Sequence, residues 1–537
     1  MNLVPLLIPE IILIVAAAVL FLLGIAAKVQ VRRFVPWIAL AGVAGAFVAS
    51  IVVQPMGQDA LGSFLVGQMG QYLKILATGV GILFVLLSWP TNAQATGNAS
   101  MDVGKDTGEF FGLMLLSLAG LLIVIGANDI IMLFMGIELA SIPTYVMVTM
   151  SRPVPESQEA GVKYFFLGAL SAAVMLFGFS YLYGTTGLTD LTAIGDQFMQ
   201  TVARSEAGHY ATQLSGYQLL AVVMLIAGFG FKLAMVPLHA YAGDVYQGAA
   251  TPMTALISFV PKASGTVALL KVLAAVGGNN FFVAEQIGTL LAVLAVLTMT
   301  FGNVLGLLQF NVKRVLAYSS IAHSGYILVG IATLVRAPGG GQVQEQALSG
   351  VLFYLTAYGV MNAAALGVLM MLPPRQPRPT TTAETYEDIA GMGRKHPFLG
   401  LMMAISCFSL IGLPLTVGFL GKLYLLSPAL SGGEYTLAIF LAVNAAISAA
   451  YYLKIIATMF LRDEAKTFAA EETGRAMIPS RPVAVAVGLS VAGTLVLGML
   501  LPATTFLTTQ TREAAQDVRN MPIEVRFRDA RPAVLAE

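Results

Sequence analysis

Charged residues are scarce in this chain. Only 11% of its 537 residues are charged, whereas 57% are hydrophobic and the mean hydropathy is +0.81. A soluble domain carries about a quarter charged residues, so this composition excludes a soluble globular protein and indicates an integral membrane protein. The net charge of +1 offers no basic surface, which excludes nucleic acid as a partner.

Cysteine is almost absent as well. The single residue, Cys407, excludes a disulfide framework, and no cluster of Cys and His provides a metal or iron–sulfur site. No strand is predicted, so no Gly-rich phosphate loop follows one. We therefore expect no cofactor on this chain.

Long apolar runs fill most of the sequence. Fourteen of them can cross the roughly 30 Å of hydrocarbon in a bilayer, which predicts an all-α polytopic fold. The predicted spans are 5–27, 35–53, 72–90, 110–126, 129–149, 161–183, 217–236, 251–275, 285–308, 319–335, 347–371, 399–428, 436–461 and 482–503.

The basic residues of the loops predict the orientation. Nearly all of them follow odd-numbered spans, and only Arg204 and Arg336 follow even-numbered ones. Because Lys and Arg gather on the cytoplasmic side, both termini are expected on the non-cytoplasmic side. The basic C-terminal tail, with Arg512 and Arg519 among its residues, disagrees with this rule, but it follows the last span.

A few lone charges interrupt the apolar spans: Glu138, Lys163, Lys232, Lys262 and Lys422. An ionisable group at bilayer depth costs several kcal/mol unless it has a partner or water. Five such residues in five spans predict a polar line along the middle of the protein, where the function is expected.

Glu138 and Lys232 are expected to form a pair on facing helices. Such a pair can bind and release a proton when a neighbouring charge changes. The alternative is a static ion pair that holds two helices together. Lys262 and Lys422 continue the series without matching acids, which favours the proton-binding interpretation.

Other lysines lie nearer the edges of the spans. The side chain of Lys163 can reach the interface by snorkelling, so its place in the central line is less well defined. Lys74, Lys271 and Lys454 lie close to helix ends and are interpreted as snorkelling anchors.

Two spans contain helix-breaking residues at similar positions. Pro237 follows Lys232 in the seventh span, and Gly412 and Pro414 precede Lys422 in the twelfth. Corresponding breaks in two halves are typical of inverted-repeat transporters, in which they line the conducted path. An ordinary proline kink is the alternative.

Two histidines add candidates for proton relay. His239 and Asp244 are predicted in the loop between the seventh and eighth spans, as a possible relay on the cytoplasmic side. His323 lies among serines in the tenth span. Histidine titrates near neutrality, but a structural polar contact is an equally good interpretation of both.

Five segments together resemble one family, the antiporter-like membrane subunits of NADH:quinone oxidoreductase (respiratory complex I), related to subunits of Mrp-type antiporters. The resemblance covers residues 95–510. The segments are GIELASIPTYV at 136–146, KYFFLGALSAA at 163–173, KLAMVPLHAYAGDVYQGAATP at 232–252, GNVLGLLQFNVKRVLAYSSIAHSGY at 302–326 and GLPLTVGFLGKLYLL at 412–426. Within that family, Lys422 and the short C-terminus make the chain most similar to the N-type subunits.

The resemblance implies two inverted five-helix repeats, helices 4–8 and 9–13, with helices 7 and 12 broken. The implied divisions are 1–95 for the first three helices, 110–276 and 285–461 for the repeats, 482–503 for helix 14 and 504–537 for the tail. Tyr241 and Gly243 stand where the family often has Trp and Pro.

The resemblance also implies the role of a proton-translocating subunit. The implied proton-transfer residues are Glu138, Lys163, Lys232, Lys262, His323 and Lys422. NADH, FMN, iron–sulfur clusters and quinone are expected on partner subunits. The expected neighbours in the membrane are an M-type subunit, small K-, J- and A-type subunits, and lipids. The expected location is the inner membrane of a bacterium. The alternatives are an Mrp-type cation/proton antiporter subunit and a structural subunit without a proton path.

Overall fold

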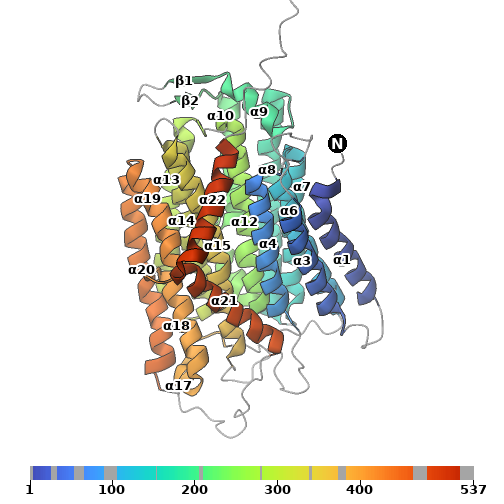
Figure 1. The fold of residues 1–537 in the computed structure, drawn as a ribbon, viewed down its shortest axis with the longest axis vertical. Coiled ribbons are helices and arrows are strands. Elements are labelled where there is room, and N and C mark those ends of the chain that lie inside the picture. The colour runs from blue at the N-terminus through green and yellow to red at the C-terminus, as the bar shows by residue number, and fades with distance from the viewer. Residues whose placement is uncertain are drawn as a thin grey trace, which may run out of the picture.

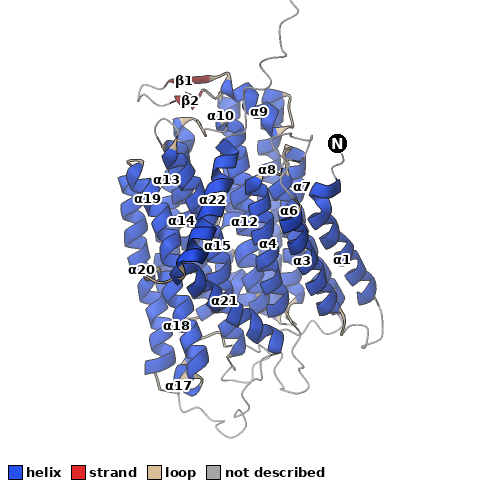
Figure 2. Cartoon of the chain, in the orientation of Figure 1, coloured by secondary structure: helices blue, strands red, loops and turns tan. Residues whose placement is uncertain are grey.

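The chain forms a bundle of membrane-spanning helices (Figure 1). The computed structural model describes residues 4–25, 33–53, 64, 66–89, 106–152, 154–204, 210–278, 281–337, 341–372, 383–463 and 480–519. Figure 2 shows how completely helices dominate these residues.

Thirteen of the described helices are long and apolar enough to cross a membrane. They are α1 (Ile8–Gly24, extended by the 3-10 turn η1, Val4–Leu7), α3 (Val35–Val52), α4 (Gln68–Leu87), α6 (Thr107–Gly126), α7 (Ile130–Met150), α8 (Pro155–Thr186), α10 (Gly216–Leu233), α12 (Thr251–Gly277), α13 (Glu285–Leu307), α14 (Val312–Arg336), α15 (Gln342–Met371), α20 (Tyr435–Leu461) and α21 (Arg481–Met499). Two shorter apolar helices, α18 (Pro397–Ile411) and α19 (Val417–Ser431), follow one another and make one further crossing. The predicted all-α polytopic fold is confirmed.

Short elements follow or connect the long helices. They are α9 (Leu191–Met199), α11 (Ala242–Gly248), α16 (Tyr386–Ile389), α17 (Met392–Lys395) and the antiparallel strands β1 (Val202–Arg204) and β2 (Tyr210–Thr212). The expectation of no strand was therefore wrong. Strands of three residues are too short to give a detectable alternation in sequence.

The seventh and twelfth crossings are both broken in the same way. α10 ends at Leu233, and the next residue, Ala234, has a left-handed backbone (φ 53°). α18 ends at Ile411, followed by Gly412 with φ 87°. Matching hydrogen bonds close the two ends, from Met235 N–H to Gly230 O and from Leu413 N–H to Phe408 O. These are helix C-caps with a left-handed residue, so the predicted breaks at Pro237, Gly412 and Pro414 are confirmed.

The interior of the bundle is formed by α12, α14 and α15. In their apolar stretches 89%, 94% and 94% of residues are buried within the chain, whereas the figure for α8 is 33%. Lys262 on α12 and His323 on α14 therefore lie in its most enclosed part.

The C-terminal region differs from the expected tail. A second helix, α22 (Leu501–Arg519), follows α21 and runs up the bundle (Figure 1). It packs against α15 and α4 through apolar residues that include Leu507 and Ala515. Its charged and amide residues, among them Arg512, Glu513 and Asp517, keep its hydropathy below that of a span, which is why the sequence predicted only a tail. Residues 520–537 of the predicted tail lie outside the described residues.

Candidate functional site

Glu138 and Lys232 are in direct contact. Glu138 lies near the middle of α7, and Lys232 lies in the last turn of α10. Lys232 Nζ is 3.2 Å from Glu138 Oε1 and 3.1 Å from the Tyr145 hydroxyl. The Lys232 side chain is 1% exposed and that of Glu138 15%. The predicted pairing is confirmed.

Lys262 has a different environment. Its ammonium group donates a hydrogen bond to the backbone carbonyl of Ser320 on α14 and lies 4.8 Å from the centre of the Tyr358 ring. Among the described residues no carboxylate forms an ion pair with Lys262. A buried lysine whose partners are neutral loses little when it releases its proton, since no paired anion is left behind.

Ser324 connects the surroundings of these two lysines. Its hydroxyl group donates to the carbonyl of Leu233, which adjoins Lys232, at 2.5 Å. The same hydroxyl lies 3.3 Å from the Ser320 carbonyl that binds Lys262. A single polar side chain of α14 thus joins the broken end of α10 to the lysine of α12.

His323 is enclosed by tyrosines. Nδ1 lies 2.5 Å from the hydroxyl of Tyr354, and Nε2 lies 3.3 Å from the hydroxyl of Tyr452. The ring also stacks on Tyr354 and lies against Tyr358, whose hydroxyl donates to the Ser320 side chain at 2.8 Å. Because a tyrosine hydroxyl both donates and accepts, this arrangement permits a proton relay and a purely structural contact alike.

Lys422 caps the broken helix that precedes it. Its ammonium group donates to the carbonyl oxygens of Leu410 (3.1 Å) and Ile411 (2.7 Å) at the end of α18. It also lies 4.9 Å from the centre of the Tyr326 ring. Carbonyls at a helix C-terminus lack intrahelical donors and carry partial negative charge, so the break provides the counter-charge for this lysine.

The corresponding break in helix 7 is capped without its lysine. The Tyr241 hydroxyl donates to the Phe231 carbonyl at 2.8 Å, and Ser324 takes the carbonyl of Leu233. Lys232 therefore pairs with Glu138 and does not cap the helix end. Tyr241, at the position where the family often has tryptophan, thus caps the C-terminus of α10.

Lys163 belongs to a separate cluster rather than to the central line. Its ammonium group lies 2.7 Å from Asp244 and 2.7 Å from Glu159, and its side chain is 41% exposed. Arg314 holds the other oxygen of Asp244 at 2.7 Å. Two cations therefore compensate the negative charge of Asp244.

The structure also corrects the local setting of His239 and Asp244. Asp244 lies in α11, the second half of the broken helix 7, rather than in a loop. His239 lies in the connection between α10 and α11. Its Nδ1 atom is buried and accepts no hydrogen bond from a described residue.

One buried cluster has no counterpart in the sequence analysis. Glu384, which precedes α16, lies 2.5 Å from Arg152 and 3.3 Å from Lys313. Lys313 also donates to the carbonyls of Gln247 and Ala249 at the end of α11. The three charges come from distant segments, so only the basic residues beside the spans could have pointed to the cluster.

Lys74 was wrongly interpreted as a snorkelling anchor. It pairs with Glu10 at 2.6 Å, and both side chains are 3% exposed. Lys271 donates to the Ala127 carbonyl at 2.6 Å. Lys454 lies against the rings of Phe310 and Tyr386.

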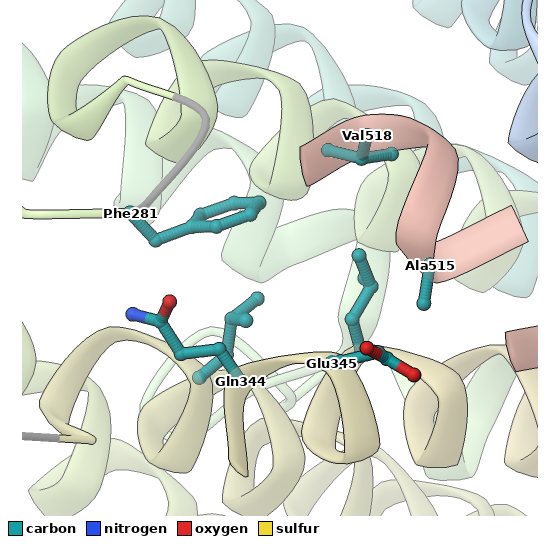
Figure 3. Close-up of a pocket in the computed structure, with 7 residues that line it drawn as sticks. Phe281, Gln344, Glu345, Ala515 and Val518 are labelled. Carbon is teal, nitrogen blue, oxygen red and sulfur yellow. The ribbon is translucent and has the colours of Figure 1, made fainter. Parts of the chain in front are cut away.

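A small pocket lies apart from these lysines (Figure 3). It encloses about 10 Å³, close to the room that one water molecule needs. Its walls are Phe281, Leu334, Gln344, Glu345, Leu348, Ala515 and Val518. No group of His, Cys, Asp and Glu among the described residues is arranged to hold a metal ion.

Comparisons with known proteins agree with this architecture. The family described as "NADH:quinone oxidoreductase/Mrp antiporter, TM" matches residues 127–448. The chain is 35% identical to NADH-quinone oxidoreductase subunit N of Trichlorobacter lovleyi, over 92% of this chain and 93% of that one. It is 34% identical to subunit N of Myxococcus xanthus, over 92% and 94%.

Solved structures show the same fold. A chain of respiratory complex I from Thermus thermophilus superposes with a TM-score of 0.71 at 28% identity, over 92% of this chain and 98% of that one. A chain of the Mrp complex from Dietzia superposes with a TM-score of 0.74 at 19% identity, over 97% and 98%. The chain therefore belongs to the NADH:quinone oxidoreductase/Mrp antiporter family of membrane subunits.

Proposed function

We propose that this chain is the proton-translocating N-type membrane subunit of a NADH:quinone oxidoreductase. The observation that carries the proposal is the series of lysines in the middle of the bundle. Lys232 has a carboxylate partner, whereas Lys262 and Lys422 are also buried and, among the described residues, bind only neutral oxygens. A structural ion-pair network does not need unpaired lysines, but a series of proton-exchanging sites does.

The proposed mechanism is electrostatic. Glu138 holds a charge on Lys232 when the two are in contact, and separating them weakens that hold. Two unit charges 4 Å apart interact by about 4 kcal/mol at an effective dielectric constant of about 20, which equals about three powers of ten in a protonation equilibrium. A change at Glu138 is therefore large enough to alter the protonation of Lys232 and, in turn, of its neighbours.

The remaining candidates take supporting roles in this proposal. Ser324 and His323 provide hydroxyl and imidazole groups between Lys232 and Lys422, along which protons can move with added water. Lys163, Asp244 and His239 lie around α11 and provide the inlet from the cytoplasmic side. Both chain termini then face the other side of a bacterial inner membrane.

Redox chemistry takes place on other subunits in this proposal. NADH, FMN, iron–sulfur clusters and quinone bind to partner chains, and an adjacent M-type subunit, small K-, J- and A-type subunits and lipids surround this chain. Energy from quinone reduction reaches Glu138 as a change in nearby charge or position.

An Mrp-type cation/proton antiporter is the second candidate, since the fold matches the Mrp chain from Dietzia as well as complex I. The two functions differ in their driving force. A complex I subunit takes part in forming a ΔpH across vesicles that are supplied with NADH. An Mrp-type antiporter exchanges cations for protons when a ΔpH is imposed without NADH.

Lys262→Ala in the assembled complex tests the proposal directly. We expect normal assembly, with ΔpH formation and quinone reductase activity reduced together, because electrostatic coupling links the two steps. Wild-type activity in both assays would contradict a proton-transfer role for Lys262. Full electron transfer without pumping would contradict tight coupling. Sodium-dependent exchange without NADH would favour the antiporter.

A further inference from the structure

We propose that Glu10, Lys74 and Lys271 form a second proton-holding site, which receives protons from the central lysines and releases them on the side of the membrane where α1 begins. This inference rests on the proposed function and extends it to helices outside the two predicted repeats.

The first component is a buried ion pair between the N-terminal helices. Glu10 is the third residue of α1, and Lys74 lies two turns into α4. Their charged atoms are 2.6 Å apart, and both side chains are 3% exposed. Lys74 also donates to the carbonyl of Leu6 at 3.0 Å, in the turn that precedes α1. The pair therefore lies close to the end of the bundle that carries the N-terminus (Figure 1).

The second component is Lys271 on the neighbouring helix α12. Its ammonium group donates to the carbonyl of Ala127, just beyond the end of α6. The helix α12 packs against α4, which carries Lys74. Among the described residues, Glu10 forms an ion pair with Lys74, whereas no carboxylate forms an ion pair with Lys271.

This charge balance separates a proton site from a static ion pair. A static pair in a membrane protein is stabilised when it is neutral overall and its oxygens are fully hydrogen-bonded. Here two lysines and one carboxylate lie on the neighbouring helices α1, α4 and α12, so the loss or return of one proton changes their net charge between +1 and zero. Moreover, apart from the ion pair, neither carboxylate oxygen of Glu10 accepts a well-formed hydrogen bond from a described residue.

The helix α12 connects the site to the central line. Lys262 and Lys271 lie on it nine residues apart, which corresponds to about 13 Å along a helix. The direction from Lys262 to Lys271 leads away from the break region and toward the end of the bundle where α1 begins.

The test uses the assembled complex in proteoliposomes, with ΔpH formation on NADH addition normalised to assembled complex. We expect Lys271→Met and Lys271→Arg each to lower the pumping rate at least twofold, since arginine keeps the charge but cannot release its proton. The outward-facing Lys454→Met is the matched control and should pump at the wild-type rate. If Lys271→Met fails to assemble, Glu10→Gln provides the same test.

Two outcomes would overturn the inference. One is wild-type pumping in Lys271→Arg, which would reduce Lys271 to a fixed charge. The other is wild-type pumping in the Glu10→Gln/Lys74→Met double variant, which would make the pair purely structural. Loss of pumping in Lys262→Ala alongside either outcome leaves the proposed function intact, whereas unaffected pumping in Lys262→Ala counts against both proposals.

Discussion

The ammonium group of Lys422 lies 2.7 Å from the carbonyl oxygen of Ile411, the last residue of the broken helix α18. The corresponding break in helix 7 is capped by Tyr241 and Ser324, and Lys232 forms an ion pair with Glu138. The two halves of the bundle thus use the same backbone break for two kinds of lysine site. One is held by a titratable acid and the other by helix carbonyls that cannot change charge.

Removal of the Glu138 charge alone should be more damaging to assembly than removal of the charges of both Glu138 and Lys232. Glu138→Gln leaves Lys232 buried with its charge uncompensated, at a cost of about 3–5 kcal/mol. We expect the Glu138→Gln/Lys232→Met double variant to recover assembled complex on native gels. Pumping should stay low in both variants, because the proton site is lost. A double variant that pumps at the wild-type rate would show that the pair only holds α7 to α10.

The two left-handed caps make a matched pair of backbone tests. The backbone of Gly412 has a φ of 87°, which is strained for any residue with a side chain. An added Cβ atom would lie 3.0 Å from Cδ of Lys422. Gly412→Ala should therefore displace the lysine and lower pumping, at a cost of about 1–2 kcal/mol in the backbone alone. Ala234→Gly relieves a similar strain in helix 7 and should assemble and pump at least as well as the wild type. Equal activity of both variants would argue against a precise geometry at Lys422.

Glu384 should make stability depend on pH. Burial disfavours its charge, but Lys313 and Arg152 hold its pKa below the ordinary value of 4.5. Because the folded-state pKa is the lower one, this stabilising contribution is complete above pH 4.5 and is lost as the pH falls through the folded-state value. Thermal unfolding of the purified complex should therefore lose part of its acid sensitivity in Glu384→Gln. At pH 7 the variant should be less stable, since two buried cations lose their partner. An unchanged pH profile would contradict the pKa assignment.

The span count, the breaks and the Glu138–Lys232 contact could be predicted because each leaves a local signal. Apolar length marks a crossing, proline and glycine mark a break, and a lone charge in an apolar run demands a partner. The partner of Lys422 could not be predicted in this way, because backbone carbonyls carry no sequence signal.

The clusters around Glu384 and Glu10 were missed for a related reason. Glu10 lies near the start of an apolar stretch and Glu384 in a polar segment between two of them, where a charge is unremarkable in sequence. Tertiary packing alone buries these acids beside Lys74 and Lys313. Likewise, the exposed fraction of Lys163 depends on how α8 packs, so its place outside the central line could not be read from its span.

Replacement of Lys422 tests the central claim most directly. If this residue works by holding and releasing a proton, Lys422→Arg should be nearly as harmful as Lys422→Met, because arginine has a pKa above about 12 and keeps its proton. A packing role predicts the reverse, since arginine preserves the charge and the hydrogen bonds to the α18 carbonyls. The measurement is ΔpH formation in membrane vesicles supplied with NADH, normalised to assembled complex. We predict that pumping is strongly reduced in both variants, and full pumping in Lys422→Arg would contradict the account.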